Sequence, residues 1–266
     1  MVSSESERHV DAILRGIEIL ETLETHPHLT LAQIREKTRL TKSRILRMCG
    51  TFISKGFIGY DPETGRYSLG PRLMLLGRAY QEANPLVSVV RQTLKELVNE
   101  TKETASFYVP SGMKRLCLVR EESPLHIRYS TPEGVERGLH SGAAGKIILA
   151  FSSKEVRELF FSEKRSYEAY TPNSITSPEA MKKETKEARI HGFARSVAER
   201  IPDAWSLGVP VFGAGNVFRG AMVLSGPLSR LTEESEKRML VILRQKGEEL
   251  SFRLGCSTRT EDIESD

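Results

Sequence analysis

Residues 29–56, LTLAQIREKTRLTKSRILRMCGTFISKG, decide the fold of the first part of the chain. Thr30 and Gln33 have the Thr-x-x-Gln spacing of a capping box, which predicts that a short helix begins here. A tight turn follows, and Thr41 is a second N-cap candidate for a longer helix. That helix ends before Gly56, because glycine suits the left-handed residue just past a helix end. Two short helices joined by a tight turn form a helix-turn-helix motif.

The longer helix has an apolar face and a basic face. Its apolar side chains recur at helical spacing and are expected to be buried: Ile45, Met48, Cys49, Phe52 and Ile53. The N-terminal half of the other face, where a recognition helix presents side chains to bases and phosphates, carries Lys42, Ser43, Arg44 and Arg47. Residues 30–56 hold seven basic residues and one acidic residue, a more positive balance than the net +4 of the whole chain. A basic helix alone is most often a solvated surface, so charge by itself leaves both interpretations open.

A hairpin is predicted directly after these helices. Two short strand-like runs, 57–60 and 67–70, flank the turn-rich segment 61–66, DPETGR. Helix, helix and hairpin in this order make a winged helix-turn-helix, whose wing contacts the DNA backbone or minor groove. We expect Arg66 at the tip of this wing.

Three further segments extend the pattern: LHSGAAGKIILAF, GFARSVAERIPDAWSLGVPVF and AMVLSGPLSRLT. Together with the helix-turn-helix region, and in this order, they resemble the IclR family of bacterial transcriptional regulators. The resemblance runs from about residue 8 to residue 255. It implies an N-terminal DNA-binding domain and a C-terminal domain that binds a small effector. The predicted DNA-binding residues are Arg39, Thr41, Lys42, Ser43, Arg44, Arg47 and Arg66.

The composition fits a soluble globular protein of two domains. The chain has 266 residues, 39% hydrophobic and 28% charged. Its three cysteines are too few and too scattered for a disulfide framework or a zinc site. The first residues lack the apolar core of a signal peptide, and no apolar run approaches membrane-spanning length. We therefore expect a cytoplasmic protein with no membrane partner.

Four segments are predicted along the chain: a winged helix-turn-helix domain at 1–70, a linker helix at 71–83, an effector-binding domain at 84–255 and a disordered tail at 256–266. The first helix, at about 9–25, is expected to bury Ile13, Leu14, Ile17, Leu20 and Leu23. The linker helix is apolar and is the candidate for subunit pairing, through Leu73, Leu75, Leu76 and Tyr80.

The second domain is predicted to be α+β. Strands are expected at 105–109, 115–120, 126–130, 193–199, 206–212 and 220–225, with helices between and after them. These elements indicate a curved antiparallel sheet with helices beside it. The resemblance implies a GAF-like sensor fold.

Catalysis is not supported by any motif. The stretch 141–146, SGAAGK, differs from a phosphate-binding loop at His140, where glycine is needed, and at Ile147, where a hydroxyl is needed. Neither Ser206 nor Ser225 has an evident base partner, and the six histidines show no metal-ligand pairing. We expect no enzyme activity, no metal and no cofactor.

A small-molecule pocket is better supported. Small residues at 142–145 let a ligand approach the N–H groups of a helix start, although close packing of that helix on the sheet explains them as well. The family resemblance implies that the effector contacts Ala143, Ala144, Ser196, Ser206, Val223 and Ser225. Arg128 or Arg137 is a candidate counter-charge, and each is also readily explained as a solvated arginine.

Two of these positions depart from the family pattern. Ser196 stands where members that bind small keto acids carry an acidic residue, and Val223 replaces the first of two hydroxyl-bearing residues. Fewer polar groups then need to be matched by the ligand. We expect an organic acid larger and more apolar than glyoxylate or pyruvate, for example an aromatic acid. Its anionic end is expected at Ala143 and Ala144, with Ser206 and Ser225 as donors.

The predicted function is ligand-responsive regulation of transcription, with repression favoured over activation. The predicted partners are a double-stranded DNA operator, a small organic acid and further copies of the chain, as a dimer or a dimer of dimers. The alternative is a winged-helix module for protein assembly, with a ligand-binding or vestigial-enzyme second domain. The basic recognition face favours DNA.

Overall fold

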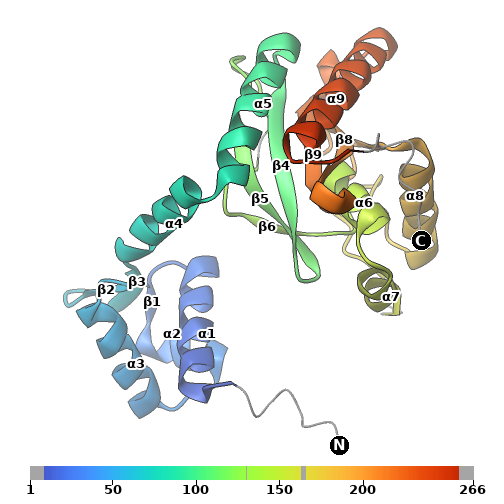
Figure 1. Cartoon of the computed structure of the whole chain (residues 1–266). Helices are drawn as coiled ribbons and strands as arrows, with labels where there is room; N and C mark the ends of the chain where they lie inside the picture. Colours follow the sequence, from blue (N-terminus) through green and yellow to red (C-terminus); the bar gives the residue numbers. More distant parts are fainter. Residues whose placement is uncertain (1–8, 130, 163–165, 258–266) are drawn as a thin grey trace, which may run out of the picture. The chain divides into compact units, whose positions relative to one another are not determined.

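The computed structural model describes residues 9–129, 131–162 and 166–257 (Figure 1). The chain divides into two compact units, residues 1–83 and 84–266, and each is described by itself. Most of the predicted disordered tail, from residue 258 onward, lies outside the described residues.

The N-terminal unit is a winged helix-turn-helix. Its elements are α1 (Asp11–Thr25), β1 (Leu29–Thr30), α2 (Leu31–Thr38), α3 (Lys42–Ser54), β2 (Ile58–Asp61), β3 (Arg66–Leu69) and α4 (Arg72–Ala83). The three strands pair antiparallel in the order β1-β3-β2. Helices α1, α2 and α3 enclose a small core in which Ile19, Ile34 and Ile45 are each 0% exposed.

Helix α1 buries only part of the expected face. Three of the side chains expected in the core are 61, 48 and 44% exposed: Ile13, Leu14 and Ile17. The buried residues are Gly16, Ile19 and Leu23, and Leu20 packs against them partly buried, so only Leu20 and Leu23 of the expected residues contribute to the core. A Cβ at Gly16 would stand 3.0 Å from the Phe52 ring, so the absence of a side chain lets α3 approach and sets the rotation of α1. Ile53 of α3, also expected in the core, is 39% exposed.

The C-terminal unit is α+β, as predicted. Its elements are α5 (Pro85–Thr101), β4 (Thr104–Ser111), β5 (Lys114–Glu121), β6 (Glu136–Gly138), α6 (Gly142–Phe151), α7 (Lys154–Ser162), α8 (Pro178–His191), β7 (Ala194–Val197), β8 (Ala204–Gly213), β9 (Val217–Pro227) and α9 (Glu233–Arg253). The strands form one antiparallel sheet in the order β6-β5-β4-β9-β8-β7.

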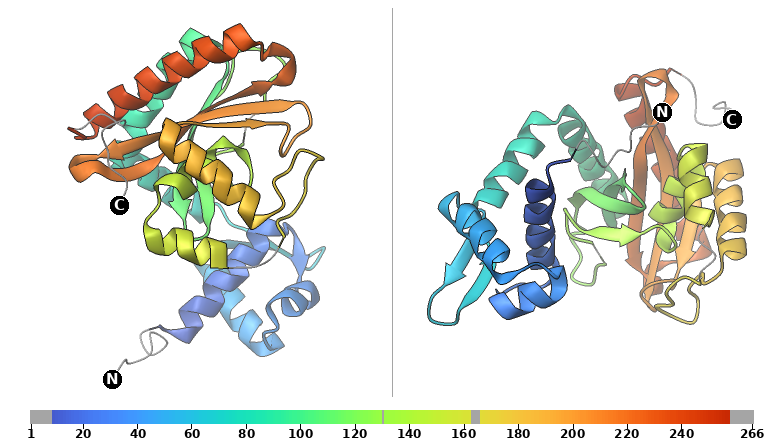
Figure 2. Two further views of the ribbon diagram at one scale, coloured as in Figure 1. Left: turned by 90° about the vertical axis from the view of Figure 1, so that its right-hand side faces the viewer. Right: turned by 90° about the horizontal axis from the view of Figure 1, so that it is seen from below.

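Helices cover both faces of this sheet (Figure 2). Alternate residues of the strands point to opposite faces. On β9, Met222 and Leu224 pack in the core beneath α5 and α9, whereas Ala221 and Val223 pack in the core beneath α6 and α8. The strands are therefore buried on both sides, and the start of α6 is held against β8 and β9.

The strand expected at 126–130 is not formed, and Ser130 lies outside the described residues. Residues 122–135 instead connect β5 to β6, which begins only at Glu136. The strand that pairs with this side of β5 is β6, at 136–138. None of the helices that the structure describes is long and apolar enough to span a bilayer.

Candidate functional site

Local hydrogen bonds fix the geometry of the helix-turn-helix. The Thr30 hydroxyl accepts from Gln33 N at 3.4 Å, and Gln33 Oε1 accepts from Thr30 N at 2.9 Å, so the predicted capping box is present. Arg39 ends α2 in a left-handed conformation with φ of 55° and makes the turn. Thr41 precedes α3 but makes no side-chain cap bond. Its hydroxyl lies 3.4 Å from that of Ser43.

Six of the seven predicted DNA-binding side chains are exposed: Arg39, Thr41, Lys42, Ser43, Arg47 and Arg66. The seventh, Arg44, is half-buried and forms an ion pair with Asp11 at the start of α1. The hydrogen bond from Arg44 lowers the pKa of the Asp11 carboxyl, so the pair stays charged. In the described part of the chain, neither Lys42 nor Arg47 has an ion-pair partner. Arg44 is therefore oriented by α1, whereas Lys42 and Arg47 are free to meet a ligand.

Arg66 does not lie at the tip of the wing. The tip is the turn at 62–65, which Asp61 closes by accepting from Glu63 N at 2.9 Å and from the Thr64 hydroxyl at 2.5 Å. Arg66 is the first residue of β3, paired with Asp61 across the hairpin. Its guanidinium donates to the His28 carbonyl at 2.6 Å. The side chain stays exposed at the base of the turn.

A cavity of about 110 Å³ opens at the start of α6, between that helix and strands β4, β8 and β9. Its lining includes all six predicted effector-binding residues: Ala143, Ala144, Ser196, Ser206, Val223 and Ser225. Tyr108, Tyr129 and Trp205 add aromatic surface. Positions far apart in the sequence are thus brought into one site by the sheet.

The first N–H groups of α6 already have acceptors within the chain. Gly142 N donates to Glu199 Oε2 at 3.0 Å, and Ala143 N donates to the Ser206 hydroxyl at 3.2 Å. Glu199 in turn accepts from Lys146 Nζ at 2.6 Å. An anion at this helix start would compete with a carboxylate that the helix and Lys146 hold. The start of α6 is therefore a weaker anion site than the sequence indicated.

The positive charge of the cavity comes from Arg115, on β5. Its side chain is 5% exposed, and one guanidinium nitrogen donates to the Gly138 carbonyl. The buried Nε atom has no hydrogen-bond partner. The pKa of Arg115 is lowered to about 10, chiefly by burial, and the nearby charges of Arg200 and Arg137 act in the same direction. Arg115 remains a cation at neutral pH, and no carboxylate of the described residues pairs with it.

A second arginine, Arg200, also lines the cavity. Its guanidinium carbon lies 4.8 Å from the centre of the Tyr170 ring, and burial lowers its pKa. Of the two arginines expected as counter-charges, Arg137 is the cross-strand neighbour of Arg115 but does not line the cavity. Arg128 is exposed and pairs with Glu122 at 3.0 Å.

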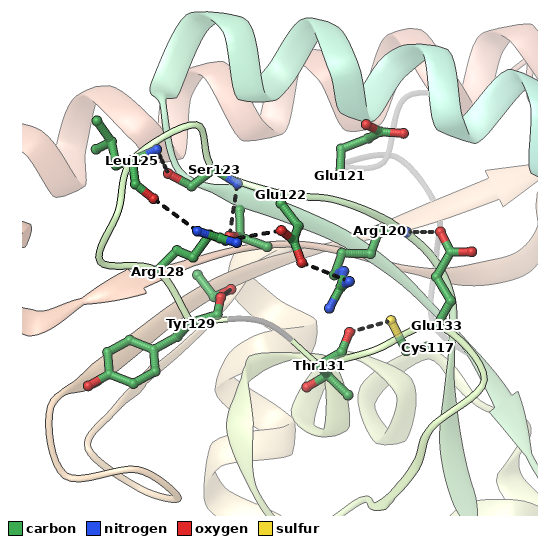
Figure 3. Close-up of polar contacts among 12 residues, drawn as sticks. Cys117, Arg120, Glu121, Glu122, Ser123, Leu125, Arg128, Tyr129, Thr131 and Glu133 are labelled. Atoms are coloured by element: carbon green, nitrogen blue, oxygen red, sulfur yellow. Dashed lines mark hydrogen bonds and ion pairs between the residues drawn. The ribbon is translucent and has the colours of Figure 1, made fainter.

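The connection at 122–135 forms one wall of the site and is tied down by polar contacts (Figure 3). Arg128 and Arg120 both bond Glu122, at 3.0 and 2.8 Å. Cys117 Sγ donates to the Thr131 carbonyl at 3.4 Å. The Ser225 hydroxyl donates to the Tyr129 carbonyl at 3.2 Å, so this predicted effector residue also anchors the wall.

The site is suited to binding rather than to bond-making chemistry. Ser206 and Ser225 are bonded to a backbone N–H and a backbone carbonyl, respectively, and neither touches a histidine or carboxylate. Across the described ranges, no group of His, Cys, Asp and Glu side chains is arranged to hold a metal ion. A buried, unpaired guanidinium beside hydroxyls and aromatic rings can bind an organic anion.

Arg115 and Arg200 were not predicted from the sequence as residues of the site. Arg115 follows Lys114 at the polar start of a strand, and two adjacent basic residues suggest exposed side chains. Its burial results from the pairing of β5 with β6, more than 20 residues later in the chain. Only a third strand predicted at 136–138, in place of 126–130, could have indicated it.

Comparison with known proteins places the chain among bacterial regulators. Two family models match: the IclR helix-turn-helix domain at residues 12–62 and the IclR C-terminal domain at residues 78–252. The regulator BhcR of Paracoccus denitrificans is 26% identical over 94% of this chain and 90% of its own length. The transcriptional repressor IclR of Escherichia coli is 24% identical over 92% of this chain and 90% of its own length.

Solved structures match over nearly the whole chain. An IclR-type regulator from Alicyclobacillus acidocaldarius has a TM-score of 0.82 at 26% identity, covering 93% of this chain and 100% of that one. A homologue from Microbacterium hydrocarbonoxydans, in complex with 4-hydroxybenzoate, has a TM-score of 0.77 at 21% identity. The match covers 92% of this chain and 99% of that one. The second likeness concerns the fold alone.

Proposed function

Because the chain belongs to the IclR family of bacterial transcriptional regulators, we propose that it binds an operator and that an organic acid in its C-terminal cavity controls this binding. We further propose that it represses transcription, as a dimer or a dimer of dimers, in the cytoplasm, where operator DNA lies. It carries out no catalytic reaction.

The exposed basic face of α3 supports the DNA-binding part of this proposal. Lys42 and Arg47 project from the helix without ion-pair partners among the described residues, and Arg44 is held beside them by Asp11. Arg66 adds a charge at the base of the wing. Such an array suits phosphate contacts from Lys42 and Arg66 and base contacts from Arg44 and Arg47.

One observation carries the effector part: a buried arginine without a carboxylate partner lines the cavity. A buried charge is costly unless it is paired, and an acid group on Arg115 supplies the pair. The rest of the lining, with Trp205, Tyr108 and Val223, favours an apolar body over a two- or three-carbon keto acid. The complex of one fold relative with 4-hydroxybenzoate supports an aromatic acid.

A protein-assembly module is the alternative, and it is not favoured. It would give no reason for the concentration of basic side chains on one face of α3. The two functions differ in their response to salt. DNA binding weakens steeply with ionic strength because bound phosphates release counterions, whereas an apolar protein contact does not.

The test has two stages and uses the full chain. First, a duplex is selected by the protein from a random pool, and its affinity is measured by fluorescence anisotropy at several salt concentrations. Second, benzoate, 4-hydroxybenzoate, pyruvate and glyoxylate are screened by thermal shift, and each hit is added to the DNA titration. We expect a steep salt dependence and a change of affinity with an aromatic acid. Failure to select any duplex would reject DNA binding, and absence of any acid response would reject the effector.

A further inference from the structure

We infer that the cavity takes an organic acid with two negative groups, one held by Arg115 and the other by Arg200. The inference rests on the proposed function and names the chemical class of its effector. It follows from an excess of positive charge that the chain itself does not neutralise.

The charges that line the cavity are two arginines and one glutamate. The glutamate, Glu199, is already engaged by Lys146 Nζ at 2.6 Å and by Gly142 N at 3.0 Å. Lys146 also bonds Glu184, which is 44% exposed and faces water. No described carboxylate forms an ion pair with Arg115 or Arg200. Two guanidinium groups are therefore left for a ligand.

The neighbourhood adds positive charge rather than removing it. Arg137 stands opposite Arg115 on β6. His140 is stacked on the rings of Tyr167 and Tyr170, with centroids 5.3 and 5.6 Å away. Burial lowers the pKa of His140, and the Arg115 charge lowers it further, so the ring stays neutral at pH 7. Glu168 is exposed, and its charge raises the pKa of Arg200 without forming an ion pair with it.

Arg115 is fixed in a position to meet an acid group. A Cβ at Gly145 would stand 2.9 Å from one of its terminal nitrogens, and a Cβ at Gly142 would stand 3.5 Å from the other. The guanidinium thus lies along the first turn of α6, at the positive end of the helix dipole. A buried guanidinium without a carboxylate partner among the described residues favours an anion beside it.

Arg200 supplies the second contact. It follows Glu199 directly, and its guanidinium packs over the Tyr170 ring at 4.8 Å. Packing on an aromatic ring leaves the edge nitrogens of the guanidinium available to a carboxylate. The cavity of about 110 Å³ limits the spacer to a few carbons or a single ring. Glutarate and isophthalate are probes of this kind.

The test compares matched acids by calorimetry on the full-length protein. Isophthalate is measured against benzoate, and glutarate against butyrate, so that each pair differs mainly in one acid group. We expect each dicarboxylate to bind about tenfold or more tightly than its partner, as one charge-assisted pair provides. Arg200→Gln should abolish this difference in affinity within each pair.

Arg137→Gln is the matched control, because it removes a neighbouring charge that does not line the cavity. It should affect mono- and dicarboxylates alike. Thermal unfolding of Arg200→Gln confirms that the variant is folded. Equal affinity for both members of each pair, or an equal loss of both in Arg200→Gln, would overturn the inference while leaving the proposed effector site in place. If no acid of either kind binds the wild type, the proposed effector site itself fails.

Discussion

Lys146 carries a charge into the interior of the C-terminal unit, with its side chain 3% exposed. Its ammonium donates to Glu199 and Glu184, both at 2.6 Å, and to the Arg195 carbonyl at 2.8 Å. Removing one partner of a buried pair leaves the other charge uncompensated, which costs about 3–5 kcal/mol. We predict that Lys146→Met lowers the free energy of unfolding by about that amount, as measured by urea denaturation.

Two further variants separate charge from packing at this position. Lys183→Met alters an exposed lysine of α8 and should change stability by less than about 0.5 kcal/mol. The double variant Lys146→Met/Glu199→Gln removes both charges and should recover most of the loss. A double variant as unstable as Lys146→Met alone would show that the stranded carboxylate is not the cause.

Val223 sets the polarity of the cavity wall. It is 4% exposed, and its methyl group is 3.3 Å from where a Cβ at Gly208 would stand. Val223→Ser adds a hydroxyl that an apolar ligand leaves unpaired, at a cost of about 1–3 kcal/mol. We predict weaker binding of benzoate and stronger binding of pyruvate, measured by calorimetry. Unchanged selectivity would mean that Val223 does not face the ligand.

Residue identities at the cavity could be predicted only in part. Ala143, Ser206 and Val223 were located by resemblance to family segments, and the sheet brings them together. Arg115 could not be located, because its burial depends on a strand pairing that local pattern does not specify. The periodicity of a sequence predicts which residues share a face of a helix or strand. It does not predict which other element packs against that face.

Among the elements, α3 allows the most direct prediction about DNA affinity. Arg44→Ala and Arg47→Ala should each weaken specific DNA binding by about 1–3 kcal/mol, because each loses base contacts. Arg44 differs from Arg47 because it also forms an ion pair with Asp11. Asp11→Asn frees Arg44 and should raise affinity, with no effect in an Arg44→Ala background. The measurement is anisotropy on the selected duplex, and circular dichroism checks the fold.

Lys42→Ala is the comparison for these variants. Loss of a phosphate contact weakens binding to all sequences alike and lowers the salt slope by about one. If the Arg44/Arg47 double variant keeps full affinity and sequence preference, α3 is not the recognition helix.

Helices were predicted from the sequence more reliably than the faces they bury. The capping box at Thr30 is a local signal, and α2 begins directly after it. Helix α1 carries two apolar stripes, and periodicity could not tell which one meets α3. The contact of Phe52 with Gly16 decides it, and this depends on the tertiary fold. The alternation of polar and apolar residues at 126–130 predicted a strand that is not formed, because strand pairing also depends on the tertiary fold.

At the scale of the whole molecule, the cavity and the basic helix belong to different compact units. An effector changes DNA affinity only by as much as its own affinity differs between the two states of the protein. We expect that difference to be transmitted from the C-terminal unit to α3.

Helix α4 is the element that we expect to join subunits. None of its residues is buried, and its large apolar side chains are 48–77% exposed: Met74, Leu75, Leu76 and Tyr80. The second apolar stripe of α1, at Ile13, Leu14 and Ile17, is exposed in the same unit. Exposed apolar side chains concentrated on one helix are typical of a surface that another chain covers.

We predict that the wild type is a dimer or larger at micromolar concentration and that Leu75→Glu/Leu76→Glu makes it a monomer, as measured by analytical ultracentrifugation. Two recognition helices held together read half-sites one helical turn apart, or a multiple of it, so the monomer should lose most of its operator affinity but keep non-specific binding. Val241→Glu changes an apolar side chain of α9 that is 66% exposed and should leave assembly intact. A double variant that stays dimeric would place the subunit contact elsewhere, and a monomer with full operator affinity would refute the two-site model of recognition.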